Sequence, residues 1–395
     1  MRIAVTGLGA VSGIGLNVEE NIDALRRKRH GMEKPRFFQT NLDVPVSEVK
    51  KSNAELKHLL GIESDKTVSR TALLGMLAAR EALSDSQIDA KAMRVGLISS
   101  TSVGGMDLSE VFYNDFRTDH SRGCLRMVSQ HDCGASTEFI ANQLGITGYT
   151  TTISTACSSA GNAIMLGARM LKHNMLDAVI VGGTDSLCKF TLNGFNSLMI
   201  LDKEHCRPFD ASRAGLNLGE GAGYIVLQNA ETARRKPYCL LTGYANANDA
   251  YHQTGCSPEG NGAFKSMSEA IAMSGVKPEE IDYINVHGTG TPNNDLSEGM
   301  ALKRIFGDKV PPFSSVKAFI GHTLGASEGI EAVYSALSVN RGFIYPNLNF
   351  KSSAPETQLV PETEFSEGNN IRNVLSNAFG FGGNDTTLLF SKFEE

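Results

Sequence analysis

Two kinds of hydrophobic pattern alternate along the whole chain. Short β-branched and apolar runs that end in small residues are typical of buried strands, and they occupy residues 2–6, 94–99, 177–181, 224–227, 283–286 and 374–376. Longer segments with helical periodicity lie between them, at residues 17–27, 71–83, 158–172, 264–274, 296–306 and 325–339. Strands that alternate with helices predict an α/β fold, in which helices cover both faces of a mixed or parallel sheet.

One stretch in each half of the chain runs from a strand through a polar turn into a helix rich in Gly and Ala, at residues 151–171 and 312–337. A helix with almost no polar face is expected to be buried, and small side chains allow two such helices to approach closely. This shared sequence pattern suggests an internal duplication. A charged segment at 232–237 is the best candidate boundary, and it divides the chain into halves at residues 1–232 and 233–395.

Composition narrows the class of protein. Hydrophobic residues make up 41% and charged residues 20%, which is ordinary for a globular protein and excludes disorder and collagen-like repeats. Glycine is abundant, at 40 of 395 residues, as expected for an α/β enzyme with many tight turns. The net charge of −6 gives no reason to expect nucleic acid or an anionic membrane as a partner.

The cysteines indicate the compartment. There are seven, and no two form a C-x-x-C motif, so neither a disulfide framework nor a zinc site is expected and a reducing compartment fits. The first residues read as a buried strand and lack the anatomy of a signal peptide. No run of 18 apolar residues could span a membrane. The predicted location is cytoplasmic.

Cys157 is the first candidate for chemistry. It lies in T-A-C-S-S-A-G, between a β-branched run and the first small-residue helix. A cysteine on such a turn lies at the positive end of the helix dipole, which is expected to lower the thiol pKa and favour the nucleophilic thiolate. A buried cysteine with a purely structural role is the alternative, and the residues alone leave both open.

Two of the nine histidines differ from the rest. His287 ends a strand and opens the turn H-G-T-G-T-P-N-N-D, and His322 lies five residues after Lys317 in V-K-A-F-I-G-H-T-L-G-A. The carboxyl end of a buried strand is where α/β sheets place their ligands. Either histidine alone is a weak signal, but together with Cys157 they suggest nucleophilic acyl chemistry assisted by two imidazoles.

Near the C-terminus, the segment F-G-F-G-G lies between two predicted strands. It reads either as a Gly-rich hairpin with aromatic packing or as a mobile Phe381 over a pocket, with backbone N–H groups free to face a developing oxyanion.

These motifs resemble those of the β-ketoacyl-[acyl carrier protein] synthases of dissociated bacterial fatty-acid synthesis, and they are most like synthase II. The matching segments run in order almost from end to end: VTGLGAVSGIG, TACSSAGNAI, CRPFDASRAGLNLGEGAG, NANDAYHQTG, HGTGTPNND, SVKAFIGHTLGASEGIE and SNAFGFGG.

The resemblance implies a thiolase-like fold, in which two duplicated halves form a five-layered αβαβα core, and a homodimer. The N-terminal half would carry the nucleophilic cysteine and the C-terminal half the catalytic histidines and lysine. By the resemblance, Cys157 accepts the acyl group, His287 and His322 are the two catalytic imidazoles, and Lys317 supports the centre in a polar network with Glu331.

The resemblance also implies where substrates bind. Thr289 and Thr291 would hold the phosphopantetheine arm, Val103 and Phe195 would line the acyl pocket, and Phe381 would act as a gate whose N–H joins that of the nucleophile in the oxyanion hole. No metal is required, although some relatives hold a structural monovalent cation at positions that match Asn285, Glu331, Ser376 and Asn377.

Three departures from the family pattern leave the subfamily and the acyl-chain preference open. The segment after Phe195 is short, Asn384 stands where threonine is usual, and Cys256 stands where proline is common. A ketosynthase of a related polyene or polyketide pathway therefore remains an alternative.

The implied reaction is a decarboxylative Claisen condensation of an acyl thioester with malonyl-acyl carrier protein in type II fatty-acid biosynthesis, with the carrier protein as partner and no cofactor. A thiolase normally needs a second cysteine near the C-terminus, but the last one here is Cys256. A non-catalytic chain-length partner subunit would lack Cys157, and a binding protein would have no use for the cysteine, histidines and lysine together. Placement by resemblance puts the basic patch for the acidic carrier at Lys66, Arg70 and Arg126.

Overall fold

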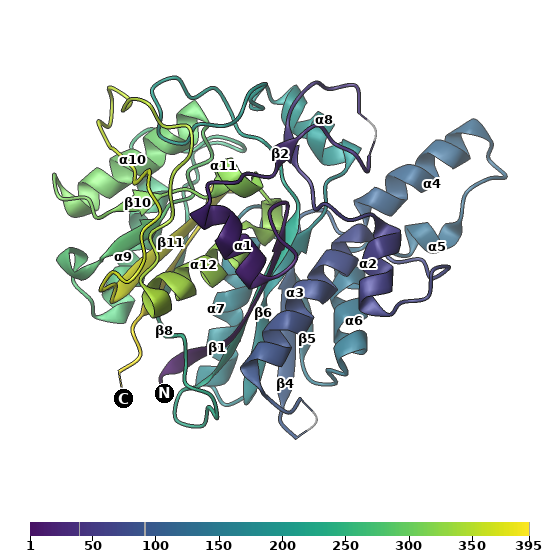
Figure 1. The fold of residues 1–395 in the computed structure, drawn as a ribbon, viewed down its shortest axis with the longest axis horizontal. Coiled ribbons are helices and arrows are strands. Elements are labelled where there is room, and N and C mark those ends of the chain that lie inside the picture. Colours follow the sequence, from purple (N-terminus) through teal and green to yellow (C-terminus); the bar gives the residue numbers. More distant parts are fainter. Residues whose placement is uncertain (39, 91, 395) are drawn as a thin grey trace.

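A computed structural model describes residues 1–38, 40–90 and 92–394 (Figure 1). Its main sheet has ten strands in the order β10-β9-β11-β12-β8-β1-β7-β6-β4-β5. The strands are β1 Ile3–Ser12, β4 Val95–Ser100, β5 Thr150–Ile153, β6 Ala178–Asp185, β7 Gly221–Asn229, β8 Cys239–Asn248, β9 Tyr283–Asn285, β10 Phe313–Ser314, β11 Asn373–Gly380 and β12 Asn384–Ser391. A small separate sheet pairs β2 Met32–Glu33 with β3 Val46–Ser47.

The sheet consists of two halves with the same topology. From β1 outward, the pairings to β7, β6, β4 and β5 are antiparallel, antiparallel, parallel and parallel. From β8 outward, the pairings to β12, β11, β9 and β10 follow the same sequence. In the described part of the chain, the two half-sheets pair with each other through two residue pairs between β1 and β8, Ala4 with Leu240 and Val5 with Cys239.

Helices complete a five-layer arrangement. α3 and α6 cover the outer face of the first half-sheet, α9 packs on the outer face of the second with α10 beside it, and α7 and α12 contact strands of both halves. The helices are α1 Val18–Arg26, α2 Asn53–Leu60, α3 Arg70–Ser86, α4 Met106–Thr118, α5 Leu125–Val128, α6 Cys133–Leu144, α7 Ser159–Lys172, α8 Lys189–Ser197, α9 Asn261–Ser274, α10 Pro292–Phe306, α11 Lys317–Ile320 and α12 Ser327–Arg341. The predicted thiolase-like α/β architecture is confirmed.

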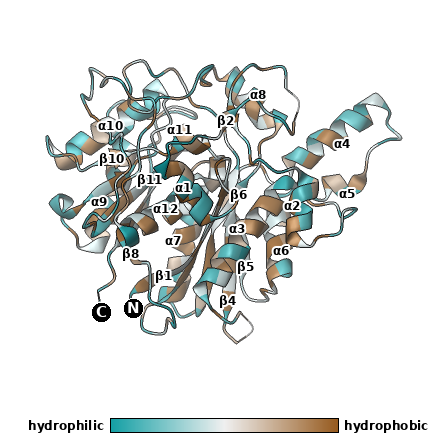
Figure 2. Ribbon diagram, viewed as in Figure 1, coloured by the Kyte–Doolittle hydropathy of each residue, from teal (hydrophilic) through white to brown (hydrophobic). Residues whose placement is uncertain are grey.

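Small residues explain how the two central helices fit between the half-sheets. A Cβ at Gly161 of α7 would lie 1.8 Å from the Glu328 carboxylate of α12, and one at Gly329 would lie 2.5 Å from the carbonyl oxygen of Gly223 in β7. Apart from Asn340 and Arg341 at its end, every residue of α12 is buried. Figure 2 shows the apolar character of the strands and helices that meet at this centre.

Local signals in the sequence fix the starts of several helices. Asn17 caps α1 by accepting the N–H of Glu20, and Ser69 caps α3 by accepting the N–H of Ala72. The segment between the halves, after β7, is a turn without helix. In the described part of the chain, no helix is both long and apolar enough to cross a bilayer.

Candidate active site

Cys157 lies in the turn between β5 and α7, at the centre of the molecule. The preceding Ala156 has a φ of 54°, a left-handed conformation that costs energy for a residue with a Cβ and is often found at functional sites. This turn directs the cysteine towards the second half of the chain, where its side chain is buried at 5% exposure.

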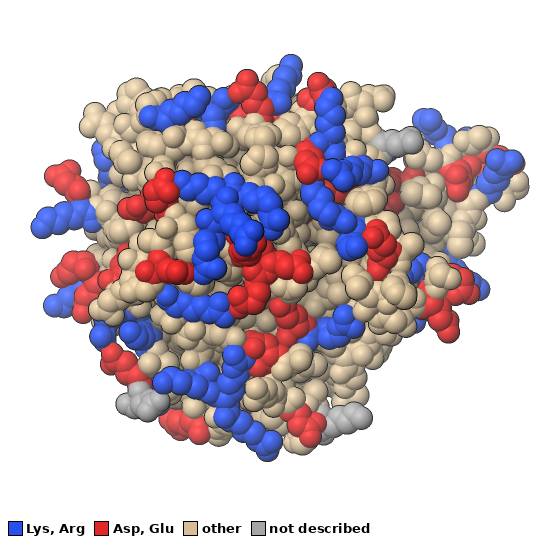
Figure 3. Space-filling view, viewed as in Figure 1, with Lys and Arg blue, Asp and Glu red and all other residues tan. Residues whose placement is uncertain are grey.

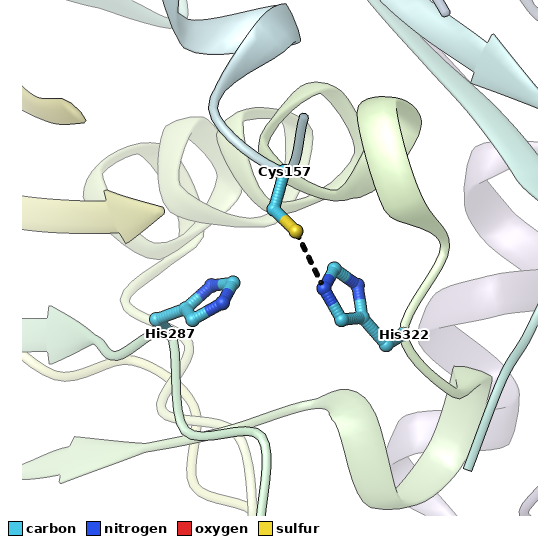
Figure 4. Close-up of side chains that lie close together, drawn as sticks. All are labelled: Cys157, His287 and His322. Atoms are coloured by element: carbon cyan, nitrogen blue, oxygen red, sulfur yellow. Dashed lines mark hydrogen bonds between the residues drawn. The ribbon is translucent and has the colours of Figure 1, made fainter. Parts of the chain in front are cut away.

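His322 comes from the second half and contacts the cysteine directly. Its Nε2 lies 3.0 Å from the Cys157 sulfur (Figure 4). Its Nδ1 accepts the backbone N–H of Leu324 at 3.2 Å, a contact made possible because Leu324 adopts a φ of 53°. Since Nδ1 is an acceptor, the proton of the neutral ring lies on Nε2 and points at the sulfur.

His287 follows β9 and faces the same sulfur. The two imidazole rings lie edge to face with their centroids 5.3 Å apart, and one nitrogen of each ring and the sulfur lie within 4.8 Å of one another. Glu298 of α10 holds the turn, because its carboxylate accepts the backbone N–H groups of His287 and Gly288, both at 2.9 Å. Nδ1 of His287 has no hydrogen-bond partner among the described residues.

A buried cation completes the centre. Nζ of Lys317 donates to Oε1 of Glu331 at 2.6 Å, and the two side chains are only 1% and 0% exposed. Burial and, second, the charge of Lys317 hold the pKa of both His287 and His322 well below the ordinary value. Both imidazoles are therefore neutral near pH 7, so each ring carries one N–H that it can donate.

The expectation that the pKa of the Cys157 thiol is lowered is wrong. Burial raises the pKa of Cys157 to about 11, although Lys317 and the backbone N–H of Phe381 act to lower it. Desolvation disfavours the thiolate more than the turn stabilises it. The resting cysteine is therefore a thiol.

A cavity of about 250 Å³ opens onto these residues. Its walls bring together eight of the residues singled out above: Cys157, Phe195, Cys256, His287, Thr289, Thr291, His322 and Phe381. The rings of Phe195 and Phe381 stack with centroids 5.6 Å apart, so the predicted gate rests on the predicted wall of the acyl pocket.

Val103 lies outside this set of wall residues. Its backbone N–H donates to Asp185 at 3.4 Å, in a loop that Asp185 also fixes through Thr101 and Ser102. Its place in an acyl pocket stays a prediction.

The four residues of the predicted cation site are all buried. Nδ2 of Asn285 lies 3.4 Å from Oγ of Ser376, and Asn377 bonds to Glu298 and Thr387. Oδ1 of Asn285 and Oε2 of Glu331 have no hydrogen-bond partner among the described residues. Free oxygens of this kind are the ligands that a hard cation takes, so these residues fit the prediction, which remains untested.

The prediction that Arg70 belongs to the carrier-docking patch is wrong. Arg70 is 6% exposed and forms an ion pair with Glu220, whose side chain is fully buried, at 2.6 Å. A cation that is fully engaged inside the protein cannot meet an acidic partner. Lys66 and Arg126 are exposed, and on the face shown in Figure 3 basic and acidic side chains are interspersed.

Sequence reasoning did not find two residues that hold the site together. Glu298 fixes the His287 turn from α10, and Oδ1 of Asn384 accepts hydrogen bonds from Ser158, Asn162 and Asn246 at 2.7, 3.0 and 2.7 Å. Asn384 thereby ties the start of α7 to the segment that follows Phe381. The sequence signal that could have indicated this role is that Asn384 stands where the family usually has threonine.

Comparisons with known proteins agree with this geometry. The family model "Beta-ketoacyl synthase, N-terminal domain" matches residues 1–233, and "Beta-ketoacyl synthase, C-terminal domain" matches residues 238–351. The chain is 32% identical to 3-oxoacyl-[acyl-carrier-protein] synthase 2 of Staphylococcus aureus (strain MRSA252) over 100% of this chain and 99% of the relative. The protein of the same name from Synechocystis sp. is also 32% identical, over 100% and 98%.

Solved structures show the same likeness. The ishigamide ketosynthase/chain length factor has a TM-score of 0.93 at 28% identity, covering 100% of this chain and 99% of that one. A ketosynthase in complex with its chain length factor from Xenorhabdus doucetiae has a TM-score of 0.85 at 29% identity, covering 99% and 98%. With family models that match most of its length and a full-length relative above 30% identity, the chain belongs to the β-ketoacyl synthase family of condensing enzymes.

Proposed function

We propose that this protein is a 3-oxoacyl-[acyl-carrier-protein] synthase that joins an acyl group to malonyl-acyl carrier protein by decarboxylative Claisen condensation in type II fatty-acid biosynthesis. The observation that carries the proposal is one buried cluster, in which a cysteine sulfur and two neutral imidazoles lie within 4.8 Å of one another on the wall of a cavity.

In the first half of the reaction the acyl group moves from the carrier thioester to the Cys157 sulfur. The carrier leaves as its thiol with the proton that Cys157 gives up, so no net charge is created in the buried site. The transient thiolate receives the Nε2–H of His322 and the backbone N–H of Phe381, which offset part of its desolvation.

In the second half the malonyl group enters with its thioester oxygen against His287 and His322. Loss of CO₂ leaves negative charge on that oxygen as an enolate, which two neutral N–H donors can hold. The enolate carbon then attacks the thioester on Cys157, the new carbon–carbon bond forms, and the cysteine leaves as the thiolate. The oxyanion of this step would face the N–H groups of Cys157 and Phe381.

The proposal needs no metal, nucleotide or flavin, because decarboxylation of malonate drives bond formation. Substrates arrive on the phosphopantetheine arm of acyl carrier protein, which Thr289 and Thr291 would hold at the cavity wall. The hydroxyls of these two threonines lie 2.9 Å apart. A cytoplasmic location accords with the seven free cysteines.

We further propose that the protein is a homodimer whose interface includes β5 and α4. β5 is the last strand of the sheet, so one of its edges pairs with no other strand of the described residues. Every residue of α4 is at least partly exposed, and α4 projects from the body of the molecule (Figure 1). Apolar side chains on α4 and the neighbouring α5 are exposed, among them Tyr113 at 59% and Leu125 at 75%, as expected of a contact surface.

The division at residues 232 and 233 also remains a proposal. Its support is the repeated strand order of the two half-sheets, with the cysteine on the first half and His287, Lys317 and His322 on the second.

A second candidate is a ketosynthase of a polyene or polyketide pathway. Two similar solved structures, at 28% and 29% identity, are the ishigamide ketosynthase/chain length factor and a ketosynthase in complex with its chain length factor. On this alternative, the β5 and α4 surface would bind a different subunit of the same fold. A protein that purifies alone at twice its mass of 42.4 kDa would favour the homodimer.

The test of the proposed reaction is release of labelled CO₂ from malonyl-acyl carrier protein by His287→Ala and His322→Ala. Both variants should still accept some acyl group on Cys157, yet both should lose decarboxylation by about 100-fold or more, the usual size of such donor effects. Wild-type rates of CO₂ release in either variant would contradict the model of two imidazoles.

A further inference from the structure

The hydroxyl of Ser327 lies on the far side of the His322 ring from the cysteine. Ser327 is the first residue of α12, it is 1% exposed, and its Oγ lies 2.9 Å from Nδ1 of His322. The hydroxyl of Thr323 lies 3.2 Å from the Ser327 oxygen. The hydroxyls of Ser327 and Thr323 therefore extend the chain of polar contacts that runs from the Cys157 sulfur through the His322 ring.

The direction of these hydrogen bonds follows from the backbone. Nδ1 already accepts the N–H of Leu324, so it carries no proton and Ser327 must be the donor. The Ser327 oxygen can in turn accept from Thr323. With both donors aimed at Nδ1, the ring proton is confined to Nε2, 3.0 Å from the Cys157 sulfur.

We propose that Ser327 is a positioning residue, which holds His322 in the tautomer that presents Nε2–H to the cysteine and to the enolate. This inference rests on the proposed function and deepens it. Without Ser327, the ring would depend on the single N–H of Leu324, at 3.2 Å, for its orientation and its tautomer.

The surroundings fix the serine hydroxyl in place. Ser327 is followed by Glu328, whose carboxylate is packed against Gly161 of α7 and accepts the hydroxyl of Thr386 at 2.5 Å. The first turn of α12 is thus clamped between the helix that follows Cys157 and strand β12. A clamped backbone presents the hydroxyl at one position, as precise orientation of a histidine requires.

The other titratable groups that face His322 do so from elements other than α12. Cys157 faces it from the turn before α7, His287 from the turn after β9, and Lys317 from α11. Glu331 of α12 neutralises Lys317.

The experiment compares Ser327→Ala with Ser327→Thr, which keeps the hydroxyl, and with Ser335→Ala as a matched control. Ser335 is a fully buried serine on the same helix, and its hydroxyl has no hydrogen-bond partner among the described residues. Three quantities are measured on each: labelled CO₂ release from malonyl-acyl carrier protein, KM for that carrier, and the ¹⁵N NMR shifts of the His322 ring.

We expect kcat for CO₂ release to fall about threefold to tenfold in Ser327→Ala, the effect of one lost hydrogen bond. KM should stay unchanged, because Ser327 touches no substrate. Wild-type ¹⁵N shifts should show Nδ1 unprotonated, and Ser327→Ala should show a mixture of tautomers. Ser327→Thr should restore both the wild-type kcat and the wild-type ¹⁵N shifts. Ser335→Ala should leave kcat, KM and the ¹⁵N shifts at their wild-type values.

Wild-type kcat and an unchanged tautomer in Ser327→Ala would overturn the inference. A protonated Nδ1 of His322 in the wild-type protein would also overturn the inference, and the ¹⁵N shifts of the wild type alone would reveal it. If the wild-type enzyme itself released no CO₂ while Ser327→Ala still changed the tautomer of the His322 ring, the proposed function would fail and the role of Ser327 as a positioning residue would stand.

Discussion

Cys157, the proposed nucleophile, lies in a site that opposes its own reactivity. Burial raises the pKa of its thiol to about 11, so nearly all of the resting enzyme holds an uncharged sulfur near pH 7. The same burial keeps both imidazoles neutral, as the proposed second half-reaction requires. A dry site therefore favours enolate stabilisation and leaves activation of the thiol to the hydrogen bonds around it.

At the residue scale, Asp385 provides a test of the electrostatics. It is 2% exposed, its Oδ1 has no hydrogen-bond partner among the described residues, and burial, with Asp249 and Glu298 nearby, raises its pKa to about 8. Between about pH 4 and pH 8 the folded state holds a proton that the unfolded state has lost, so stability falls as pH rises through that range.

Asp385→Asn keeps the shape of the neutral acid and removes the titration. Between pH 5 and pH 8 the wild type should lose up to about 4 kcal/mol more unfolding free energy than the variant, as measured by urea unfolding at each pH. The exposed Asp308→Asn should keep the wild-type slope. Equal slopes for wild type and Asp385→Asn would show that Asp385 is ionised in the fold.

At the scale of elements, the turn η3 Phe381–Gly383 between β11 and β12 carries the candidate gate. Phe381 is half-buried against Phe195, whereas the nearby Phe379 is 5% exposed and lies against His287. Gly382 has a φ of 81°, which glycine adopts at little cost. A half-buried ring on such a turn can move without opening the core.

Phe381→Ala should therefore leave Cys157 acylatable and raise the ratio of uncoupled CO₂ release to condensed product, because malonate could enter before the acceptor is loaded. Its melting temperature should change little, whereas Phe379→Ala should cost about 3–5 kcal/mol, as for a buried phenylalanine. An unchanged ratio together with a collapsed melting temperature in Phe381→Ala would mean that the ring is only packing.

The sequence predicted some elements well and others poorly, for physical reasons. Strands such as β6 and β7 are apolar runs buried on both faces, which periodicity finds easily. β5 was expected only as the strand that opens the first small-residue stretch and is missing from the apolar runs, because it is a short, partly exposed edge made of three threonines and one isoleucine. The helix expected from residue 325 starts at Ser327, because the turn that folds Leu324 back onto His322 occupies the preceding residues as a separate 3₁₀ turn, Leu324–Ala326.

At the scale of the whole molecule, the ion pair of Arg70 and Glu220 joins positions 150 residues apart. Arg70 also donates to backbone carbonyls of Val49 and Lys51 and to the side chain of Asn53. The sequence could not reveal this, because arginine is usually exposed and its partner is distant along the chain. By contrast, local motifs mark Cys157, His287, Lys317 and His322 as candidates, and the structure places these four residues close together.

Removing one member of this pair leaves the other charge buried and unpaired. Arg70→Ala should therefore lower the unfolding free energy by about 3–5 kcal/mol, measured by urea unfolding. Lys66→Ala, which removes an exposed cation resting on Phe139, should cost about 1 kcal/mol or less. A loss below about 1 kcal/mol in Arg70→Ala would contradict a structural role for this arginine.

The central claim is that Cys157 carries the acyl group between the two half-reactions. The most direct measurement is the intact mass of the protein after incubation with acyl-acyl carrier protein, followed by peptide mapping. Wild type and Cys256→Ala, which changes the other thiol on the cavity wall, should each gain one acyl group on Cys157. Cys157→Ala should gain none and should form no condensed product. An acyl adduct or substantial condensation in Cys157→Ala would contradict the account.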